Sequence, residues 1–478
     1  MTIDDLKQNA GRRIVLVNPP VAVVDPVQLY FYADSFPLGL HQIRRWLASM
    51  GHEVELADMM GYGKHEKSFD EMLESGELAP LPRMPAGAPE TDFAVWRYGQ
   101  GVGWLESWFA GRDSPDEVWV SCSILFNAFL AHEVIRWVRK RFPEALVRFG
   151  GGYPTLLPED AASSGAHDIV QGRIYEADAM QPSLEGIAHP LHYVSFRLTT
   201  GCPNRCAFCI NGRDRMVRHD ADEVVDFIQR TRETLGIKYF NNWDPNVLRF
   251  KPHLKKFLRE LASRELDVRI RFDMGLEPPL LDDELLDLLA VSGVDAFTLP
   301  FETSDPVFAR LFNKPYTIIS SIRAAVRMRE RNLSIRECHG TYVIGCPDEE
   351  FADLFATYHV THRFGLRSTP FPLLVIPGSP IFQRYSALLK GKPSSCYNGH
   401  LFPLIQDKER LGRYRMMLGI LSANDDRSKS QIAARLPEDL REAYGRGRVR
   451  GERLVEQVLD TDEEDSLDLL ERLHNKVQ

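Results

Sequence analysis

The sequence TTGCPNRCAFC, residues 199–209, decides how the rest of the chain is interpreted. It holds Cys202, Cys206 and Cys209, and it follows the short apolar stretch 193–198, which is typical of a buried strand. In barrels of parallel strands, the loops at the carboxyl ends of the strands carry the functional site. The sequence therefore predicts a site with three cysteines at the carboxyl edge of a parallel sheet.

These three cysteines have the spacing of ligands to an iron–sulfur cluster. Gaps of three and two residues let one short loop bring three thiolates to three corners of a four-iron cube. The fourth iron then has no protein ligand and is open to a small molecule. Phe208, beside the last cysteine, is expected to shield the cluster from water and to tune its potential. The alternative is structural zinc, but zinc takes four ligands and no fourth Cys or His follows at finger spacing.

The composition is that of a folded protein. A chain of 478 residues is long enough for two or three globular units, and 44% hydrophobic with 26% charged residues is ordinary for them. A net charge of −9 without a long basic run argues against a nucleic-acid partner. No stretch of eighteen apolar residues and no apolar signal core are present, so we expect no membrane partner and a cytoplasmic location. Seven cysteines, three of them clustered, do not form a disulfide framework.

Strand and helix patterns alternate before the cysteine loop and predict an α/β domain with a doubly wound, Rossmann-like parallel sheet over residues 1–185. Residues 61–115, which contain several prolines and glycines, are expected to be an insertion or lid. The expected strands are 14–17, 54–56, 118–121 and 146–149, and the expected helices are 38–50 and 128–141.

The alternation continues after about residue 192 and predicts a partial (β/α)6 barrel of the TIM type over residues 190–400. Six repeats are short of the eight that close a full barrel, so the barrel is expected to be open. The expected strands are 193–198, 237–240, 268–272, 295–301, 340–344 and 371–376, and the expected helices are 222–235, 252–263, 282–291 and 349–364. Strand patterns end near residue 401, so residues 401–478 are expected to form a C-terminal helical cap.

The cysteine motif CxxxCxxC after a strand, with an aromatic residue before the last cysteine, resembles the signature of radical S-adenosylmethionine (SAM) enzymes. Residues 340–349 (GTYVIGCPDE) resemble the fifth-strand motif of that family, which packs near the adenine, and residues 377–380 (PGSP) resemble its sixth-strand ending. The resemblance implies that the three cysteines hold a [4Fe-4S] cluster that cleaves SAM reductively. It also implies that Gly345 and Pro347 contribute to cofactor binding.

The same resemblance indicates further cofactor-binding candidates at strand ends. In the family the end of the second strand binds the methionyl amine of SAM, and the matching residues 241–244 (NNWD) depart from the usual Gly-Gly-Glu, which makes Asn242 and Asp244 candidates. At the fourth strand end, Glu302 resembles the glutamate of a Glu-Ser pair, although a helix N-cap is an alternative role. No catalytic residue is identified. Other polar residues near strand ends are equally well explained as structural groups: Arg271, Asp273, His339 and Tyr342.

The N-terminal half resembles the cobalamin-binding domain that precedes the barrel in many radical SAM enzymes. The matching segments are 18–20 (NPP), 37–40 (PLGL), 51–54 (GHEV) and 150–155 (GGGYPT). Glycines at strand ends let the backbone approach a bulky cofactor, although a doubly wound sheet needs such turns as well. The Asp-x-His-x-x-Gly cobalt-ligand motif is absent, because residues 58–60 (DMM) have methionine in place of histidine and follow another strand. The resemblance implies that this domain binds cobalamin, and it leaves the axial ligand of the cobalt unassigned.

Together these features predict a radical SAM enzyme that methylates carbon in a small molecule or natural product with the help of cobalamin. It would receive electrons from an external one-electron reductant such as flavodoxin or ferredoxin. One alternative keeps both folds but uses a cobalamin-free N-terminal scaffold for cyclisation, rearrangement or aminocarboxypropyl transfer. Another alternative is a non-catalytic iron–sulfur sensor. The sequence names neither the substrate nor the carbon–sulfur bond of SAM that breaks.

Overall fold

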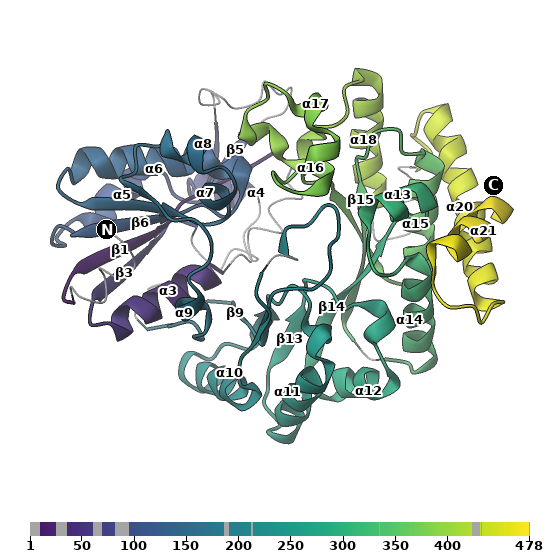
Figure 1. The fold of residues 1–478 in the computed structure, drawn as a ribbon, viewed down its shortest axis with the longest axis horizontal. Coiled ribbons are helices and arrows are strands. Elements are labelled where there is room, and N and C mark those ends of the chain that lie inside the picture. The colour runs from purple at the N-terminus through teal and green to yellow at the C-terminus, as the bar shows by residue number, and fades with distance from the viewer. Residues whose placement is uncertain are drawn as a thin grey trace. The chain divides into compact units, whose positions relative to one another are not determined.

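The computed structural model divides into two compact units, each with its own parallel sheet (Figure 1). The first unit is Met1–Val194 with Lys390–Leu401, and the second is Ser195–Leu389 with Phe402–Gln478. No helix among the described residues has the length and apolar character needed to cross a membrane. The residues that the structure describes are 10–24, 36–60, 69–81, 95–185, 191–211, 214–333, 335–422, 431 and 433–477.

The first unit is built on a five-stranded parallel sheet of order β3-β1-β6-β7-β8. Along β1, Val15 and Val17 pack into one apolar core, and Ile14 and Leu16 pack into another. This alternation shows that both faces of the sheet are covered, as in a doubly wound fold. The bounds are β1 Arg13–Asn18, β3 Glu53–Asp58, β6 Glu117–Ser121, β7 Leu146–Gly150 and β8 Asp168–Ile169, with the helices α3 Leu38–Ser49, α6 Ala128–Arg141 and α9 Tyr175–Asp178.

Part of the expected insertion pairs with an earlier strand, Val21–Val23, in a small antiparallel sheet of order β2-β5-β4. Its strands are β2 Val21–Val23, β4 Leu78–Pro80 and β5 Trp96–Tyr98, and the helices α4 Phe69–Glu74 and α5 Val102–Phe109 belong to the same stretch. Residues 61–68 and 82–94 of the insertion lie outside the described residues.

The second unit holds a six-stranded sheet of order β16-β15-β14-β13-β12-β9, with parallel pairing from β12 to β16. Because β9 and β16 stand at opposite ends of this order, the barrel is open, and the fold class expected from the sequence is confirmed. The strands are β9 Tyr193–Phe196, β12 Tyr239–Asn242, β13 Arg269–Phe272, β14 Val294–Glu302, β15 Glu337–Ile344 and β16 Arg367–Pro372. The helices between them are α10 Ala221–Leu235, α11 Lys251–Ser263, α12 Asp283–Val291, α13 Pro306–Phe312, α14 Ile318–Glu330 and α15 Phe351–Arg363.

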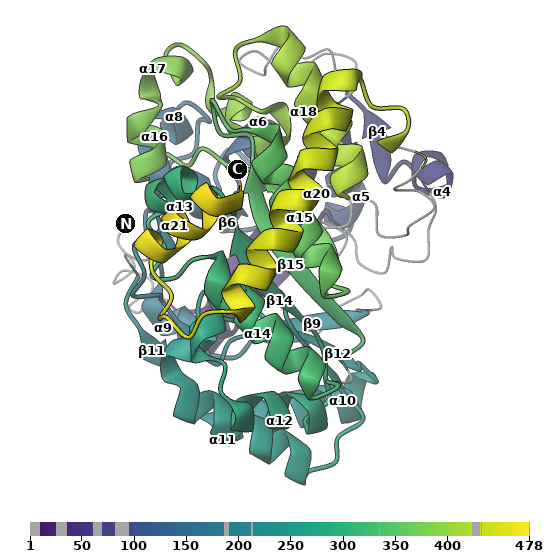
Figure 2. The same cartoon turned by 90° about the vertical axis from the view of Figure 1, so that its right-hand side faces the viewer.

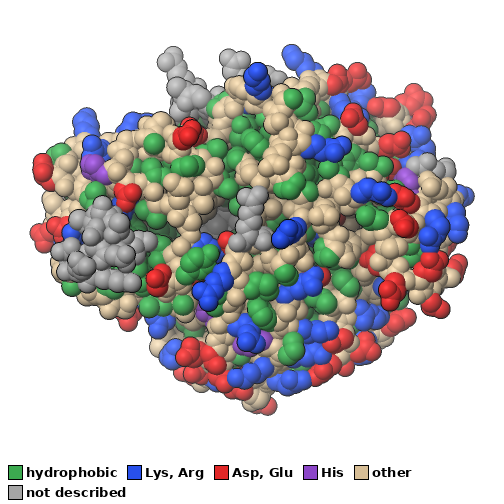
Figure 3. Space-filling view, in the orientation of Figure 1, with side chains coloured by type: hydrophobic (Ala, Val, Ile, Leu, Met, Phe, Trp, Pro, Cys, Tyr) green, Lys and Arg blue, Asp and Glu red, His purple; other side chains and the backbone are tan. Residues whose placement is uncertain are grey.

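The outer helices α10, α11 and α12 carry acidic and basic side chains side by side (Figure 3). Several of these charges are paired between helices: Lys256 lies 2.8 Å from Asp222, and Arg264 lies 2.6 Å from Asp226. Such exposed pairs contribute at most about 1 kcal/mol each. The helical layer is therefore held mainly by the apolar side chains beneath it.

The last strand differs from its predicted position of 371–376, because β16 is Arg367–Pro372. The apolar run 373–376 follows the strand instead, and Leu373 and Val375 are buried there as loop residues. The strand itself contains Pro370 and Pro372, and it tolerates them because it lies at the edge of the sheet. Similarly, β12 begins two residues later than predicted.

The segment Lys390–Leu401 was expected at the end of the barrel, but it belongs to the first unit. Its short helix η5, Ser394–Tyr397, packs against α6 and against η1, Leu125–Asn127, which follows β6. The Ser394 hydroxyl also donates a hydrogen bond of 2.9 Å to Asp160. The chain thus returns to its first unit before it completes the second.

The C-terminal region is helical, with α18 Lys408–Leu421, α20 Glu438–Leu459 and α21 Leu467–Val477. The long helix α20 runs along α15 (Figure 2). Two glycines on α20 face this contact. A Cβ atom on Gly447 would lie 2.4 Å from the Phe355 Cβ, and one on Gly451 would lie 2.8 Å from the Ala356 carbonyl oxygen. The two helices pack this closely because these positions have no side chain.

We expect Gly447→Ala to lower the free energy of unfolding by about 1–3 kcal/mol, because the added methyl group overlaps the side chain of Phe355 and the α15 backbone. Urea unfolding followed by circular dichroism measures the change. The matched control is Gly445→Ala in the same helix, where an added Cβ meets nothing within 4 Å. The control should be neutral or stabilising, since alanine favours helix. An equal loss in both variants would contradict the packing explanation.

Candidate functional site

The three cysteines lie together in the loop that follows β10, Thr199–Thr200, just after β9. Cys206 is 8% exposed, and Cys202 and Cys209 are half-buried. No three His, Cys, Asp or Glu side chains of the described residues are grouped as a single metal ion requires. A cubane cluster does not need its ligands to converge on one ion, because each cysteine binds its own iron at a separate corner.

Backbone hydrogen bonds fix the cysteine loop against two other segments of the second unit. The Ala207 amide donates to the Phe312 carbonyl at 2.8 Å, and the Ala207 carbonyl accepts from the Ile381 amide at 3.1 Å. The Asn313 side chain adds a third bond, to the Arg205 carbonyl at 3.1 Å. Hydrogen bonds within the protein therefore hold the loop in place.

Phe208 projects from this loop toward α13. Its ring meets the ring of Phe312 edge-on, with centroids 5.5 Å apart. The expected shielding role of Phe208 remains a prediction, and its aromatic contact supplies the apolar surface that such a role needs.

Asp244 binds the start of the cysteine loop. Its carboxylate accepts hydrogen bonds from the amides of Leu198 (3.0 Å) and Thr199 (2.7 Å) and from the Thr199 hydroxyl (2.9 Å). Burial raises the pKa of the Asp244 carboxyl to about 7, against these hydrogen bonds, which lower it. Asn242 accepts a hydrogen bond from the Asp244 amide at 3.2 Å. These contacts give Asp244 a loop-positioning role.

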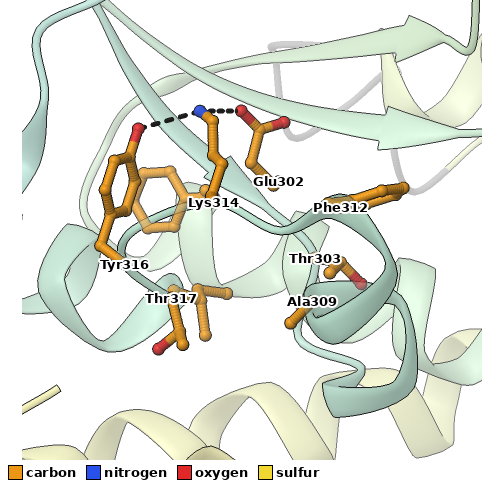
Figure 4. A pocket seen from close by; sticks show the side chains of 9 residues that line it. Glu302, Thr303, Ala309, Phe312, Lys314, Tyr316 and Thr317 are labelled. Carbon is orange, nitrogen blue, oxygen red and sulfur yellow. Dashed lines mark hydrogen bonds and ion pairs between the residues drawn. The ribbon is translucent and has the colours of Figure 1, made fainter. Parts of the chain in front are cut away.

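Glu302 ends β14 with a left-handed backbone (φ 57°) and forms an ion pair with Lys314. Lys314 comes from the segment between α13 and α14, and its ammonium group lies between Glu302 and the Tyr316 hydroxyl, 2.9 Å away (Figure 4). These three residues line a small cavity together with Phe312 and others. Burial lowers the pKa of Lys314, but Glu302 and Tyr316 outweigh burial and hold the pKa above its usual range. Lys314 is therefore a fixed, buried cation.

Burial raises the pKa of two cysteine thiols, Cys206 and Cys209, although the positive charge of Lys314 lowers it. Burial raises the pKa of the Cys206 thiol to about 12, and the charge of Lys314 acts in the opposite direction. Burial also raises the pKa of the Cys209 thiol, against the backbone amide of Asn211 and the charge of Lys314. Buried thiols of this kind lose their protons when they bind a metal. The donor set and the nearby cation both suit an anionic iron–sulfur cluster.

The turn after β15 contains Gly345 and Pro347 and is braced by a buried carboxyl group. Glu349 accepts a hydrogen bond from the Gly345 amide at 3.1 Å and lies 3.1 Å from the hydroxyl of Tyr414 on α18. The Tyr414 hydroxyl also donates to the Cys346 carbonyl at 3.0 Å. Helix α18 thus helps to fix the turn that is predicted to bind a cofactor, and Pro347 is half-buried in this turn.

Glu349 should make stability depend on pH. Burial raises the pKa of Glu349 from 4.5 to about 8, against its hydrogen bonds. Between these values the folded chain holds a proton that the unfolded chain has lost, so stability falls as pH rises through this range, by up to about 1.4 kcal/mol per unit. Glu349→Gln should flatten this slope in thermal unfolding between pH 5 and 8. The exposed neighbour Glu350, replaced by Gln, is the control, and an unchanged slope in Glu349→Gln would contradict the assignment.

Other polar candidates lie on β13 and β15. Arg271 and His339 both approach Glu337, at 3.5 and 3.2 Å, and Arg271 also pairs with Asp273 at 3.3 Å. Tyr342 is fully buried, and its hydroxyl lies 2.9 Å from a serine hydroxyl. Since each has a partner within the protein, the structural explanation suffices for these residues.

In the first unit, the segment compared with the cobalt-ligand motif lies in the apolar core. Met59 and Met60 are 0% and 2% exposed. The glycine triplet after β7 meets the loop after β6: a Cβ on Gly151 would lie 2.6 Å from the Cys122 carbonyl oxygen, and one on Gly152 would lie 2.5 Å from that of Ser123. The fold itself requires these glycines, so they do not by themselves indicate a cofactor.

Sequence reasoning did not identify Lys314. It lies twelve residues after Glu302, beyond a helix, and no motif marks it in the sequence. Only its burial and its ion pair identify it as part of the site.

Comparisons with known proteins show what part of the chain is similar to a known family. Residues 196–357 match the family described as the Radical SAM superfamily. A cytidylyl-2-hydroxyethylphosphonate methyltransferase of Streptomyces wedmorensis is 26% identical over 181 residues, which cover 36% of this chain and 33% of that protein. A ribosomal protein uS12 methylthiotransferase RimO of Crocosphaera subtropica is 24% identical over 47% of this chain and 54% of its own length. The chain thus spans between a third and about half of these relatives.

Two solved structures share the fold over most of the chain. The radical SAM methyltransferase TsrM from Kitasatospora setae, with tryptophan substrate and a SAM analogue bound, has a TM-score of 0.56 at 18% identity and covers 80% of this chain and 77% of its own. The cobalamin-dependent SAM radical enzyme OxsB, with aqua-cobalamin and SAM bound, has a TM-score of 0.56 at 13% identity. The match covers 98% of this chain and 79% of OxsB. At such identities the likeness shows the fold, and it includes both units.

Proposed function

We propose, on the premise that residues 196–357 form a radical SAM domain, that this chain is an enzyme that cleaves SAM reductively. Cys202, Cys206 and Cys209 would hold a four-iron cluster. The cysteine loop carries the proposal, because it combines the family motif with a fixed backbone and a buried cation beside the thiols. When bound, the cluster supplies an electron to SAM at the iron that no cysteine ligates.

In this proposal Lys314 and Glu302 bind the methionyl end of SAM. That end is a zwitterion with one carboxylate and one ammonium group, and the two side chains offer the complementary charges at one place. Both are 16% exposed or less, so their charges are weakly screened. The left-handed backbone of Glu302 is the kind of strain that persists at functional sites.

We further propose that the reaction is cobalamin-dependent methylation of carbon in a small-molecule substrate. The proposal is supported by the fold shared with TsrM and OxsB and by the methyltransferase relative. Cobalamin, where bound, supplies the methyl carrier; the first unit would hold it at the carboxyl ends of its parallel strands, where open sheets bind ligands. Met59 and Met60 would not be cobalt ligands, since both are buried in apolar cores. An external reductant such as flavodoxin or ferredoxin would supply electrons.

Anaerobic reconstitution tests the proposal. The chain is incubated with iron, sulfide and hydroxocobalamin, desalted, and analysed for metal content before SAM and a reductant are added. We expect about four irons per chain, retained cobalamin, and deoxyadenosine together with S-adenosylhomocysteine. A chain that consumes SAM but retains no cobalamin would favour the scaffold alternative with cyclisation, rearrangement or aminocarboxypropyl transfer. A cluster without SAM binding would favour the sensor, and failure to retain iron would exclude the proposal.

A further inference from the structure

We infer that Asn246 donates a hydrogen bond to the thiolate of Cys202 and thereby sets the reduction potential of the cluster. The inference rests on the proposed function, since it assumes that Cys202 ligates a cluster. Asn246 lies between β12 and the short helix η3, Val247–Phe250, and is 6% exposed. Its side-chain nitrogen is 3.8 Å from the Cys202 sulfur. Two segments far apart in the sequence therefore meet at one thiol.

The orientation of the Asn246 amide follows from its second partner. The same nitrogen is 2.6 Å from the Glu277 carboxylate. A carboxylate only accepts hydrogen bonds, so the nitrogen, and not the oxygen, must face Glu277. An amide nitrogen carries two hydrogens, and the one that Glu277 does not use is available to the sulfur. Both of these contacts are made by the side-chain nitrogen, so the Asn246 side chain acts as a donor.

A network of side chains fixes Glu277 and, through it, the donor. Arg249 donates to Glu277 at 2.6 Å and to the Asn204 side-chain oxygen at 2.8 Å, and Asn204 donates to Glu277 at 3.3 Å. Asn204 stands in the cysteine loop itself, between Cys202 and Cys206. The Glu277 side chain is 4% exposed. The donor is therefore held rigidly, largely out of water, and tied to the loop that carries its acceptor.

Such a donor should favour the reduced cluster. Reduction adds negative charge to the cluster and its sulfur ligands, and an N–H group aimed at a sulfur stabilises that charge more strongly than it stabilises the oxidised state. The effect is larger in a buried site, where the effective dielectric constant is low. Cys209 also accepts a hydrogen bond, from the Asn211 backbone amide at 3.4 Å, which replacement of a side chain leaves in place unless the new residue is proline. The Asn246 bond is a side-chain bond and can be tested.

The experiment is a redox titration of the reconstituted cluster, followed by electron paramagnetic resonance without SAM, in the full chain and in Asn246→Leu. Leucine has a similar volume but no N–H group. We expect the reduction equilibrium to shift about tenfold toward the oxidised cluster, which is about 59 mV for a one-electron couple. An unchanged potential in a fully loaded Asn246→Leu protein overturns the inference. Absence of a cluster from the unmodified chain would instead overturn the proposed function.

The matched control is Asn313→Gly, which removes another side-chain bond to the same loop, to the Arg205 carbonyl, but no bond to sulfur. Glycine suits the left-handed backbone of Asn313 (φ 50°). An equal shift in Asn313→Gly would assign the effect to loop position and overturn the inference. Should Asn246→Leu fail to load, Asn246→Ala, which also has no side-chain donor, provides the same test. Failure of both, with Asn313→Gly loaded, would also overturn it, because Asn246 would then be needed to assemble the cluster.

Discussion

Replacement of Cys206 by serine should abolish the iron content of the reconstituted chain and lower deoxyadenosine formation by more than about 100-fold. Residues outside the coordination sphere of a metal site typically contribute 10- to 100-fold, so loss of a ligand should exceed that range. Cys206 is the middle ligand of the three and is 8% exposed, so water reaches this corner poorly as a replacement ligand. Iron and sulfide analysis, the cluster absorption band and product quantification measure the outcome.

The control for this variant is Cys396→Ser, which removes a half-buried cysteine from η5, outside the cysteine loop. It should retain full iron content and activity. Retention of a complete cluster by Cys206→Ser would contradict the ligand assignment. A loss of iron in both variants would indicate a general folding defect instead.

Replacement of Lys314 by methionine should weaken SAM binding about 100-fold, or by about 2.8 kcal/mol. The ammonium group of Lys314 is the buried cation that the proposal assigns to the SAM carboxylate. The same substitution leaves Glu302 buried without its ion-pair partner, so the folded chain should also lose about 3 kcal/mol of stability. Anaerobic calorimetry of SAM binding and thermal unfolding measure the two effects.

A double variant separates binding from stability. Glu302→Gln added to Lys314→Met removes the uncompensated charge, so stability should recover while SAM affinity remains low. Lys255→Met is the matched control, because Lys255 is 13% exposed and pairs with Asp282 and Glu284 on the helical layer. It should leave SAM affinity unchanged. Recovery of SAM affinity in the double variant would contradict the role assigned to Lys314.

The sequence predicts most elements of the fold well because the signals are local. Helix α6 was expected at 128–141 and spans Ala128–Arg141, since its apolar residues recur at helical spacing. The cysteine loop was found by spacing alone. Strand β16 was misplaced, because an apolar run buried in a loop resembles a strand, whereas the real edge strand contains two prolines.

The site was predicted less completely, because its chemistry depends on contacts between distant residues. The position of Asp244 at a strand end was evident, but that its oxygens are occupied by Leu198 and Thr199 was not. Lys314 and Asn246 carry no local pattern. Their importance comes from burial and from partners that only folding brings together.

The placement of residues 390–401 in the first unit has a consequence for synthesis of the chain on the ribosome. The first unit lacks η5, and with it the Ser394 bond to Asp160, until the stretch Ser195–Leu389 has been translated. At 5–20 residues per second, this is a delay of roughly 10 to 40 s. During that interval the surface of α6 and η1 that η5 covers stays exposed to water and to chaperones. A fragment that ends at residue 194 would never bury it.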